Sequence, residues 1–377
     1  MKDIQMVDLL GQYEKIKTGI DEAILSVVQS SQYINGPEVK GFQKDLEDYL
    51  DVKHVIPCAN GTDALQIAMM ALGLKPGDEV ITANFTYVAT VEVIGLLNLT
   101  PVLVEVNPDT FNIDTVSLEN AITSNTKAIV PVHLYGQCAN MEEVMRIAKQ
   151  YNLFVIEDTA QAIGADYTFS NGESKKAGTI GNIGTTSFFP SKNLGCYGDG
   201  GAMFTNDDEL AKKLKMIANH GQSTQYYHDE IGVNSRLDSI QAAVLRKKLP
   251  HLNTYIESRN KAATYYDNAF SELDWLTIPA RDSKSTHVFH QYTLKTKGIN
   301  RDELRSYLSE NGVPAMVYYP LPLHKQKAYK DSRYDSVDFS NTEALNESVI
   351  SLPMHTELSD EHLEIITKTV KEFKNKI

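Results

Sequence analysis

The sequence predicts an α/β fold, in which a large domain built on a mixed sheet is followed by a smaller α+β domain. Short apolar runs alternate with longer helical patterns over the first 250 residues. Strands separated by helices pair in parallel, in a sheet that is covered on both faces. Between residues 178 and 206 the pattern changes to two apolar runs joined by a glycine-rich turn. These runs indicate two strands with no helix between them.

The alternating pattern is clearest in the first half of the chain. Five apolar runs predict strands, at residues 54–60, 79–85, 100–106, 127–136 and 153–160. The segment GTDALQIAMMALGL, which follows the first of these runs, has apolar residues at helical spacing. It predicts a helix that ends at Gly73.

A long helical pattern starts near Asp238 and contains Pro250, which predicts a kink or break. We place the domain boundary there, with a large domain at residues 1–250, including an N-terminal helical segment, and a small domain at residues 251–377. The small domain is expected to contain a strand at 287–296, a helix at 299–312, a loop rich in Tyr and Pro at 317–326 and a closing helix at 359–377. A cleft is expected between the two domains.

The composition excludes several classes of partner. The 377 residues include 36 Lys and Arg against 49 Asp and Glu, a net charge of −13, whereas nucleic acids and anionic membranes select basic surfaces. The N-terminus lacks the apolar stretch of a secretory signal, and no segment approaches the ~18 apolar residues of a membrane-spanning helix. Three widely spaced cysteines, with no CxxC and no nearby His pair, predict no metal site and a reducing, cytoplasmic compartment.

Polar residues follow the predicted strands at their carboxyl ends, where open α/β sheets bind ligands. Asp158 follows the apolar run LFVI and Glu157, and Gln161 comes three residues later. A carboxylate at this position can be a metal ligand, a helix cap or the partner of a cofactor. Gln161 is expected to project into the same cleft.

Lys192 lies in TTSFFPSKNLGCYGDGGA, a segment of small and turn-forming residues. A lysine on a constrained loop after a buried strand differs from the usual lysine on an exposed helix face. Desolvation and neighbouring groups can lower the pKa of such an amine, as a nucleophilic lysine requires. An ordinary surface lysine is the alternative interpretation.

The residues Asn60, Gly61 and Thr62 lead into the first predicted helix. Free backbone N–H groups at a helix N-terminus, the Thr62 hydroxyl and the close approach that Gly61 permits together form an anion site. A plain N-cap by Thr62 or Asp63 explains the same residues. No GxGxxG follows a strand and no GxxxxGK(S/T) occurs, so dinucleotide and P-loop sites lack their fingerprints.

Together these groups suit pyridoxal 5′-phosphate. Its aldehyde needs a lysine, its pyridine nitrogen needs a carboxylate that holds the proton, and its phosphate needs a helix N-terminus with hydroxyl groups. An aromatic ring over the opposite face of the cofactor would complete the site. Tyr87, after the strand at 79–85, is placed for this contact, with a core or surface tyrosine as the alternative.

Five motifs resemble the DegT/DnrJ/EryC1/StrS family of nucleotide-sugar aminotransferases: CANGTDAL, FTYVAT, VIEDTAQAIGA, SFFPSKNLGCYGDGGA and GVNSRLDSIQAA. The resemblance runs from INGPEVKGF near residue 34 to SLPMH at 351–355. It implies the aspartate-aminotransferase-like fold type I, pyridoxal phosphate as the cofactor and L-glutamate as the amino donor. It also implies a homodimer in which each active site is completed by the partner chain.

The resemblance further implies roles for single residues. Lys192 would bind the cofactor and carry the proton between cofactor and sugar, Asp158 would pair with the pyridinium nitrogen, and Gln161 would contact the phenolic oxygen. The other implied contacts are Gly61, Thr62 and Ser187 at the phosphate, Tyr87 on the ring, and Asn234 at the phosphate of the neighbouring subunit's cofactor. Relatives with histidine at the lysine position are dehydratases, so Lys192 implies transamination.

The motifs LYGQCAN, SKNLGCYGDGGA, GVNSRLDS and PLPLHKQ are most similar to one branch of the family. That branch aminates carbon 3 of UDP-2-acetamido-2-deoxy-3-oxo-D-glucuronate, for cell-surface polysaccharides such as the O-antigen of lipopolysaccharide. It implies that Arg236, Tyr318 and Tyr319 lie at the sugar, and Tyr318 stands where histidine is expected. Arg236 can pair with a carboxylate in bidentate geometry. His324 and Lys325 are further candidates, with surface placement as the alternative.

Two other functions stay open. The same fold can aminate another sugar nucleotide, such as a dTDP-3-oxo-6-deoxyhexose or a 4-oxo sugar. A non-catalytic regulator with this fold is the second alternative, and it predicts a missing lysine or an attached DNA-binding module. Lys192 is present, and no basic helix-turn-helix segment occurs in the sequence.

Overall fold

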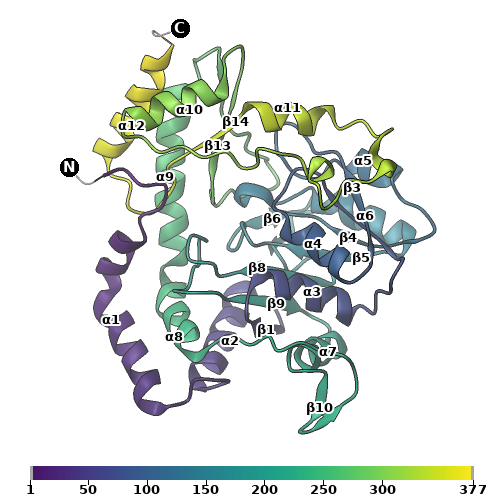
Figure 1. Cartoon of the computed structure of the whole chain (residues 1–377). Coiled ribbons are helices and arrows are strands. Elements are labelled where there is room, and N and C mark those ends of the chain that lie inside the picture. The colour runs from purple at the N-terminus through teal and green to yellow at the C-terminus, as the bar shows by residue number, and fades with distance from the viewer. Residues whose placement is uncertain (1–2, 375–377) are drawn as a thin grey trace.

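The computed structural model describes residues 3–374, and its largest element is a seven-stranded sheet with the strand order β1-β9-β8-β5-β4-β2-β3 (Figure 1). The strands are β1 (His54–Cys58), β2 (Glu79–Ala83), β3 (Thr100–Val104), β4 (Thr126–Val130), β5 (Phe154–Asp158), β8 (Ile183–Ser187) and β9 (Gly201–Thr205). Within this sheet β9 alone runs against its neighbours. The predicted mixed sheet is therefore confirmed.

Helices cover both faces of the large sheet. Neighbouring residues of a strand point to opposite faces, so alternate residues contact different helices. Val80 and Ala128 pack with one set of helices, and Ile81 and Ile129 with the other. The first set is α3 (Gly61–Ala71), α4 (Ala89–Leu96) and α7 (Asp208–Ala218), and the second is α5 (Thr115–Asn120) and α6 (Met141–Tyr151). The predicted first helix is thus α3, and Gly73 follows it in the left-handed region at φ 71°.

The predicted strand at 127–136 is shorter in the structure. β4 ends at Val130, because Pro131 has no N–H group to continue the hydrogen-bond ladder. The chain then turns through a short 3-10 helix, Leu134–Gly136. The predicted alternation of strands and helices is otherwise present along this part of the chain.

Three helices share an apolar cluster with β1 and β9: α2 (Pro37–Leu50), α8 (Ser239–Lys248) and the start of α9 (Leu252–Phe270). The helix α1 (Leu9–Ser30) packs against α8 on the outside of the molecule (Figure 1). Arg246 of α8 forms ion pairs with Glu38, at 3.1 Å, and Asp45, at 2.8 Å, both on α2. Pro250 lies in a 3-10 turn, Leu249–His251, between α8 and α9. The break predicted at this proline is therefore present.

A second sheet, with the order β12-β13-β14, is antiparallel and has its own apolar cluster with α9, α10 and α12. Its elements are β12 (Leu276–Thr277), β13 (Tyr292–Thr296), β14 (Val349–Leu352), α10 (Arg301–Glu310) and α12 (Asp360–Phe373). Residues 375–377, the end of the predicted closing helix, lie outside the described residues. The domain boundary near residue 250 stays a prediction.

The strand predicted at 287–296 is shorter because its first part bonds to the large sheet's loops instead. Val288 N donates to Gly136 O at 2.8 Å, and Gln291 N donates to Tyr135 O at 3.3 Å. The remaining elements are the hairpins β6 (Asp166–Thr168) with β7 (Ser174–Lys176) and β10 (Gln222–Thr224) with β11 (Tyr227–His228), the helix α11 (Ser340–Ser348), and the 3-10 turns Leu323–Lys325 and Ser332–Tyr334. Among residues 3–374, no helix combines the length and apolar character that crossing a membrane requires.

Candidate functional site

The predicted site residues gather at the carboxyl edge of the large sheet. Asp158 is the last residue of β5, Ser187 is the last residue of β8, and Tyr87 follows β2 by four residues. These three strands run in parallel, so their carboxyl ends meet at one edge of the sheet. Open α/β sheets bind their ligands at this edge.

Asp158 is buried and its two carboxylate oxygens are held separately. Thr90 Oγ1, from the first turn of α4, donates to Oδ2 at 2.9 Å, and Ala160 N donates to Oδ1 at 3.1 Å. Both contacts are donated to the carboxylate, which fits its ionised form. Thr90 was not among the predicted site residues. Its position in FTYVAT, three residues after Tyr87, is the signal that would have found it.

Lys192 lies on the loop between β8 and β9, and neighbouring segments fix this loop. Lys192 N donates to Phe189 O at 2.8 Å, and Asn193 Nδ2 donates to Val288 O at 2.8 Å. Part of the lysine side chain stays accessible, but desolvation of the amine lowers the pKa of Lys192 from 10.5 to about 8. The negative charge of Asp158 opposes this shift and raises the pKa of Lys192. The amine is therefore partly neutral near neutral pH.

The N-terminus of α3 lies against Ser187. A Cβ atom on Gly61 would lie 2.7 Å from Ser187 Cβ, so only glycine fits there without a shift. Asn60 Oδ1 caps the helix by accepting from Asp63 N at 2.8 Å. Among the described residues the N–H groups of Gly61 and Thr62 have no hydrogen-bond acceptor. Two free amide groups beside a hydroxyl are the donors that the predicted anion site requires.

Gln161 joins two aromatic residues of the site. Its Oε1 accepts from Tyr135 N at 2.8 Å, and its Nε2 donates to Tyr319 Oη at 3.1 Å. One Nε2 hydrogen remains for a ligand. The Tyr319 ring lies 6.0 Å from the ring of Tyr87, between centroids, and Tyr87 is 57% exposed. Tyr318 is connected through its carbonyl oxygen, which accepts from Tyr135 Oη.

The His324 side chain contacts three other residues of the chain. Its ring stacks on Phe339 at 4.6 Å, its Nδ1 lies 2.7 Å from Asn84 Nδ2, and its Nε2 lies 3.5 Å from Glu343 Oε1. Desolvation and the neighbouring Lys325 lower the pKa of His324. These contacts tie the loop of Tyr318 and Tyr319 to Asn84, just after β2. The structure therefore places His324 as a support of this loop, and no contact brings it to Lys192.

Asn234 and Arg236 flank Ser235, which lies beside the α3 anion site. Ser235 Oγ accepts from Ala59 N at 3.0 Å, one residue before the Asn60 cap. Asn234 is exposed, and Arg236 is half-buried. Arg236 forms no ion pair with any residue between 3 and 374, so its charge is available to an anionic ligand.

The donor set fits pyridoxal phosphate. The edge of the sheet combines an amine of lowered pKa, a buried carboxylate beside it, and a free helix N-terminus with a serine hydroxyl. Within the described part of the chain no group of three or more His, Cys, Asp and Glu side chains is arranged to hold a metal ion. With the mixed sheet, this set defines a fold type I, pyridoxal-phosphate-dependent enzyme.

Comparison with known proteins gives the family. The model of the DegT/DnrJ/EryC1/StrS aminotransferase family matches residues 14–371, so the chain belongs to this family. A "UDP-2-acetamido-2-deoxy-3-oxo-D-glucuronate aminotransferase" of Pseudomonas aeruginosa is 46% identical over 96% of this chain and 98% of its own. A "Pleiotropic regulatory protein" of Geobacillus stearothermophilus is also 46% identical, over 98% of both chains.

Solved structures agree with this membership. A DegT DnrJ EryC1 StrS aminotransferase from Brucella abortus has a TM-score of 0.92 and 42% identity, over 98% of this chain and 99% of its own. The structure of NtdA from Bacillus subtilis with bound cofactor PMP has a TM-score of 0.88 and 31% identity, over 97% of this chain and 82% of its own. The predicted fold, family and cofactor are therefore confirmed.

Proposed function

We propose that this aminotransferase moves an amino group from L-glutamate to carbon 3 of UDP-2-acetamido-2-deoxy-3-oxo-D-glucuronate. The observation that carries the transamination is the position of Lys192 on the loop after β8, the strand that ends at Ser187 and pairs with the strand that ends at Asp158. Desolvation lowers the pKa of this amine to about 8. The choice of substrate rests on the similarity to the Pseudomonas aeruginosa aminotransferase named for this sugar, which is 46% identical. We place the reaction in the cytoplasm and in the synthesis of a cell-surface polysaccharide, such as an O-antigen.

Each residue of the proposed site would have a separate role. Bound pyridoxal phosphate would supply storage for the amino group and delocalisation of the electron pair left when a C–H bond breaks. Asp158 would hold the proton on the ring nitrogen, and Lys192 would bind the aldehyde and move the proton at the substrate carbon. Gly61, Thr62 and Ser187 would bind the phosphate, with Tyr87 over the ring and Gln161 at the phenolic oxygen.

Binding of the sugar acid would rest on Arg236. The chain carries a net charge of −13, so an anionic sugar nucleotide needs a local cation, and Arg236 has no acidic partner among the described residues. Its guanidinium can bind a carboxylate in a bidentate manner. Tyr318 and Tyr319 would line the sugar, since Gln161 and Tyr135 hold them at the site. His324 would support this loop without touching the sugar.

We further propose a homodimer in which Asn234 reaches the phosphate in the neighbouring subunit. Asn234 is exposed, and the adjacent β10–β11 region exposes Tyr226 (82%), Tyr227 (69%) and Ile231 (86%). Apolar side chains exposed together are typical of a protein interface. Sedimentation equilibrium that finds only monomers at the assay concentration would contradict this proposal.

Attachment of pyridoxal phosphate to the apo-protein should depend on pH, with a midpoint near 8. The reacting amine must be neutral, so the initial rate should rise as the pH passes through the pKa of Lys192 and level off above it. The rate of chromophore formation between about pH 6 and pH 10 measures this, and Nα-acetyl-lysine gives the control curve with its ordinary pKa of about 10.4. Asp158→Asn should move the midpoint lower, because the charge of Asp158 raises the pKa of Lys192.

The substrate is tested by a panel of keto sugar nucleotides. The UDP-linked 3-oxo-glucuronate, its counterpart without the carboxylate, a dTDP-3-oxo-6-deoxyhexose and a 4-oxo sugar are each incubated with the protein and L-glutamate. Mass spectrometry should find the amino product from the first substrate, and Arg236→Gln should weaken its use by about 1.5–3 kcal/mol, the range for hydrogen bonds to charged groups. The substrate without the carboxylate should be indifferent to Arg236→Gln. Faster amination of the dTDP or 4-oxo sugar would overturn the substrate assignment.

A second candidate is the regulator, because one relative with 46% identity has that name. A protein that keeps the fold for regulation alone has no need of a desolvated lysine beside a carboxylate. Here both groups are present at one sheet edge. Amino transfer to none of the sugars in the panel, in protein that binds the cofactor, would favour the regulator.

A further inference from the structure

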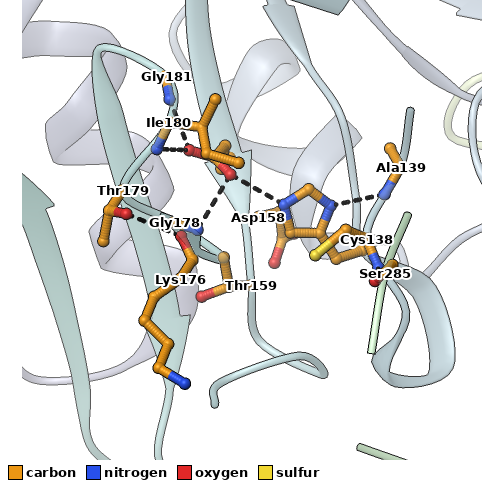
Figure 2. Close-up of polar contacts among 12 residues, drawn as sticks. Cys138, Ala139, Asp158, Thr159, Lys176, Gly178, Thr179, Ile180, Gly181 and Ser285 are labelled. Atoms are coloured by element: carbon orange, nitrogen blue, oxygen red, sulfur yellow. Dashed lines mark hydrogen bonds and ion pairs between the residues drawn. The ribbon is translucent and has the colours of Figure 1, made fainter. Parts of the chain in front are cut away.

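A buried carboxylate next to Asp158, that of Glu157, accepts four hydrogen bonds. Glu157 is fully buried in β5. Its Oε1 accepts from Ile180 N, at 2.7 Å, and Gly181 N, at 2.6 Å. Its Oε2 accepts from Gly178 N and from His133 Nε2, both at 3.0 Å. Figure 2 draws these contacts as dashed lines and labels the amide donors Gly178, Ile180 and Gly181. Only an acceptor with no proton of its own satisfies four donors, so the carboxylate form is the one that fits.

His133 extends this network to the backbone of Asp158. The imidazole is fully buried, and its Nδ1 accepts from Ala139 N at 3.1 Å (Figure 2). This contact leaves the ring proton on Nε2, which donates to Glu157. The backbone N–H of His133 donates to Asp158 O at 3.0 Å. Side chain and backbone of one histidine therefore hold two consecutive residues of β5.

The network connects the two strands that carry the proposed cofactor contacts. The three amide donors to Glu157 lie in residues 178–181, the turn that leads into β8 and so to Ser187. Glu157 itself directly precedes Asp158. We infer that Glu157 and His133 are positioning residues, which fix the distance between the ring-nitrogen partner Asp158 and the phosphate contact Ser187. This inference rests on the proposed function, because it takes these two residues as the cofactor contacts.

The chemistry of the network argues for positioning in addition to stability. A buried charged network often gives no more stability than an apolar cluster of the same volume, but it requires one geometry of its partners. Here that geometry joins Glu157 in β5 to His133, which follows β4, and to the turn at 178–181, which precedes β8. A group that orients a binding residue without touching the ligand typically changes metal affinity by 10- to 100-fold when it is mutated. We expect an effect of about tenfold on cofactor binding.

The test variant is Glu157→Gln. The side-chain volume is kept, but one carboxylate oxygen is replaced by an amide NH2 group, which cannot accept from the donors that face it. Its matched control is Glu105→Gln. Glu105 is also buried, and its carboxylate accepts from Val106 N, Asn341 N and Thr342 N at 2.8–3.0 Å. It follows β3, which β2 and β4 separate from β5. The control therefore breaks a similar network away from Asp158.

Two measurements on the apo-proteins decide the inference. Titration with pyridoxal phosphate should give a dissociation constant about tenfold higher for Glu157→Gln than for wild type, and an unchanged one for Glu105→Gln. Hydrogen exchange should be about tenfold faster in the peptide that contains residues 178–181 in Glu157→Gln alone. Affinity within about twofold of wild type in Glu157→Gln, or equal weakening in Glu105→Gln, would overturn the inference.

A second variant covers failure of Glu157→Gln to fold. His133→Gln keeps an N–H donor for Glu157 but replaces the ring acceptor of Ala139 N by a flexible amide oxygen, so it should fold and weaken cofactor binding by a smaller factor. Unchanged binding in folded His133→Gln would also overturn the inference. A wild-type protein that does not bind pyridoxal phosphate would contradict the proposed function instead, so the two failures are distinguishable.

Discussion

Replacement of Lys192 by alanine should abolish amino transfer while the protein remains folded. The loop of Lys192 is held by Asn193 Nδ2 on Val288 O and by Lys248 Nζ on Gly195 O, both at 2.8 Å, and neither contact uses the Lys192 side chain. The amine is proposed both to bind the cofactor and to move the proton. Its loss should therefore lower the turnover rate by more than about 10⁴-fold, the upper end for one positioned acid–base group. Stopped-flow or product assays with the sugar substrate measure this loss.

Lys248 makes the test specific, because it is a second buried amine. Burial lowers the pKa of Lys248 to about 8, as for Lys192. Borohydride treatment of the wild-type protein with pyridoxal phosphate should fix the cofactor to the peptide that contains Lys192. Label on the Lys248 peptide would overturn the assignment. Lys176→Ala, which removes a partly exposed ion pair with Asp166 and a cation–π contact with Tyr49, is the control that should keep its activity.

The sequence motifs predict the parts of the site that depend on local structure. A carboxylate at the end of an apolar run lies at a strand end, and a glycine before a helical pattern lies at a helix N-terminus. Asp158 and Gly61 could be placed for these reasons. Lys192 could be placed because small and turn-forming residues define a loop on both sides of it.

Residues whose roles depend on distant partners were beyond this kind of reasoning. His324 was expected at the sugar, but its partner Asn84 lies 240 positions away in the sequence, and no local pattern indicates that pair. Glu157 directly precedes Asp158, and no local pattern indicates a role for its side chain. Its amide donors come 21 to 24 residues later and His133 lies 24 residues earlier. Both residues are polar groups whose hydrogen-bond partners only the tertiary structure brings close.

The turn at 135–136 explains why the strand predicted at 287–296 is too long. The apolar pattern of HVFHQYTLKT predicts a continuous strand, but residues 288 and 291 find hydrogen-bond partners in the turn at 135–136. This docking brings Val288 O to Asn193. A segment from the second half of the chain thereby fixes the loop that carries Lys192.

The second large effect is expected from Asp158→Asn. The amide can keep both hydrogen bonds, accepting from Ala160 N and donating to Thr90 Oγ1, so the variant should fold and bind pyridoxal phosphate. A neutral amide does not hold a proton on the ring nitrogen. The turnover rate should therefore fall by about 10³-fold, as when one preorganised electrostatic contact to the transition state is lost. Asp166→Asn, which removes one carboxylate on the β6–β7 hairpin, should have no comparable effect.

A cofactor analogue separates charge from position at Asp158. Pyridoxal phosphate methylated on the ring nitrogen keeps a positive charge there without a proton, so it does not depend on a carboxylate to remain charged. In Asp158→Asn this analogue should restore a large part of the lost turnover, whereas in wild type it should give no gain. Thr90→Val, which removes the hydroxyl donor to Asp158 Oδ2 and leaves the carboxylate, should lose less than Asp158→Asn. Failure of the analogue to raise turnover in Asp158→Asn would mean that Asp158 acts by position alone, and the proposed role in holding the ring proton would be wrong.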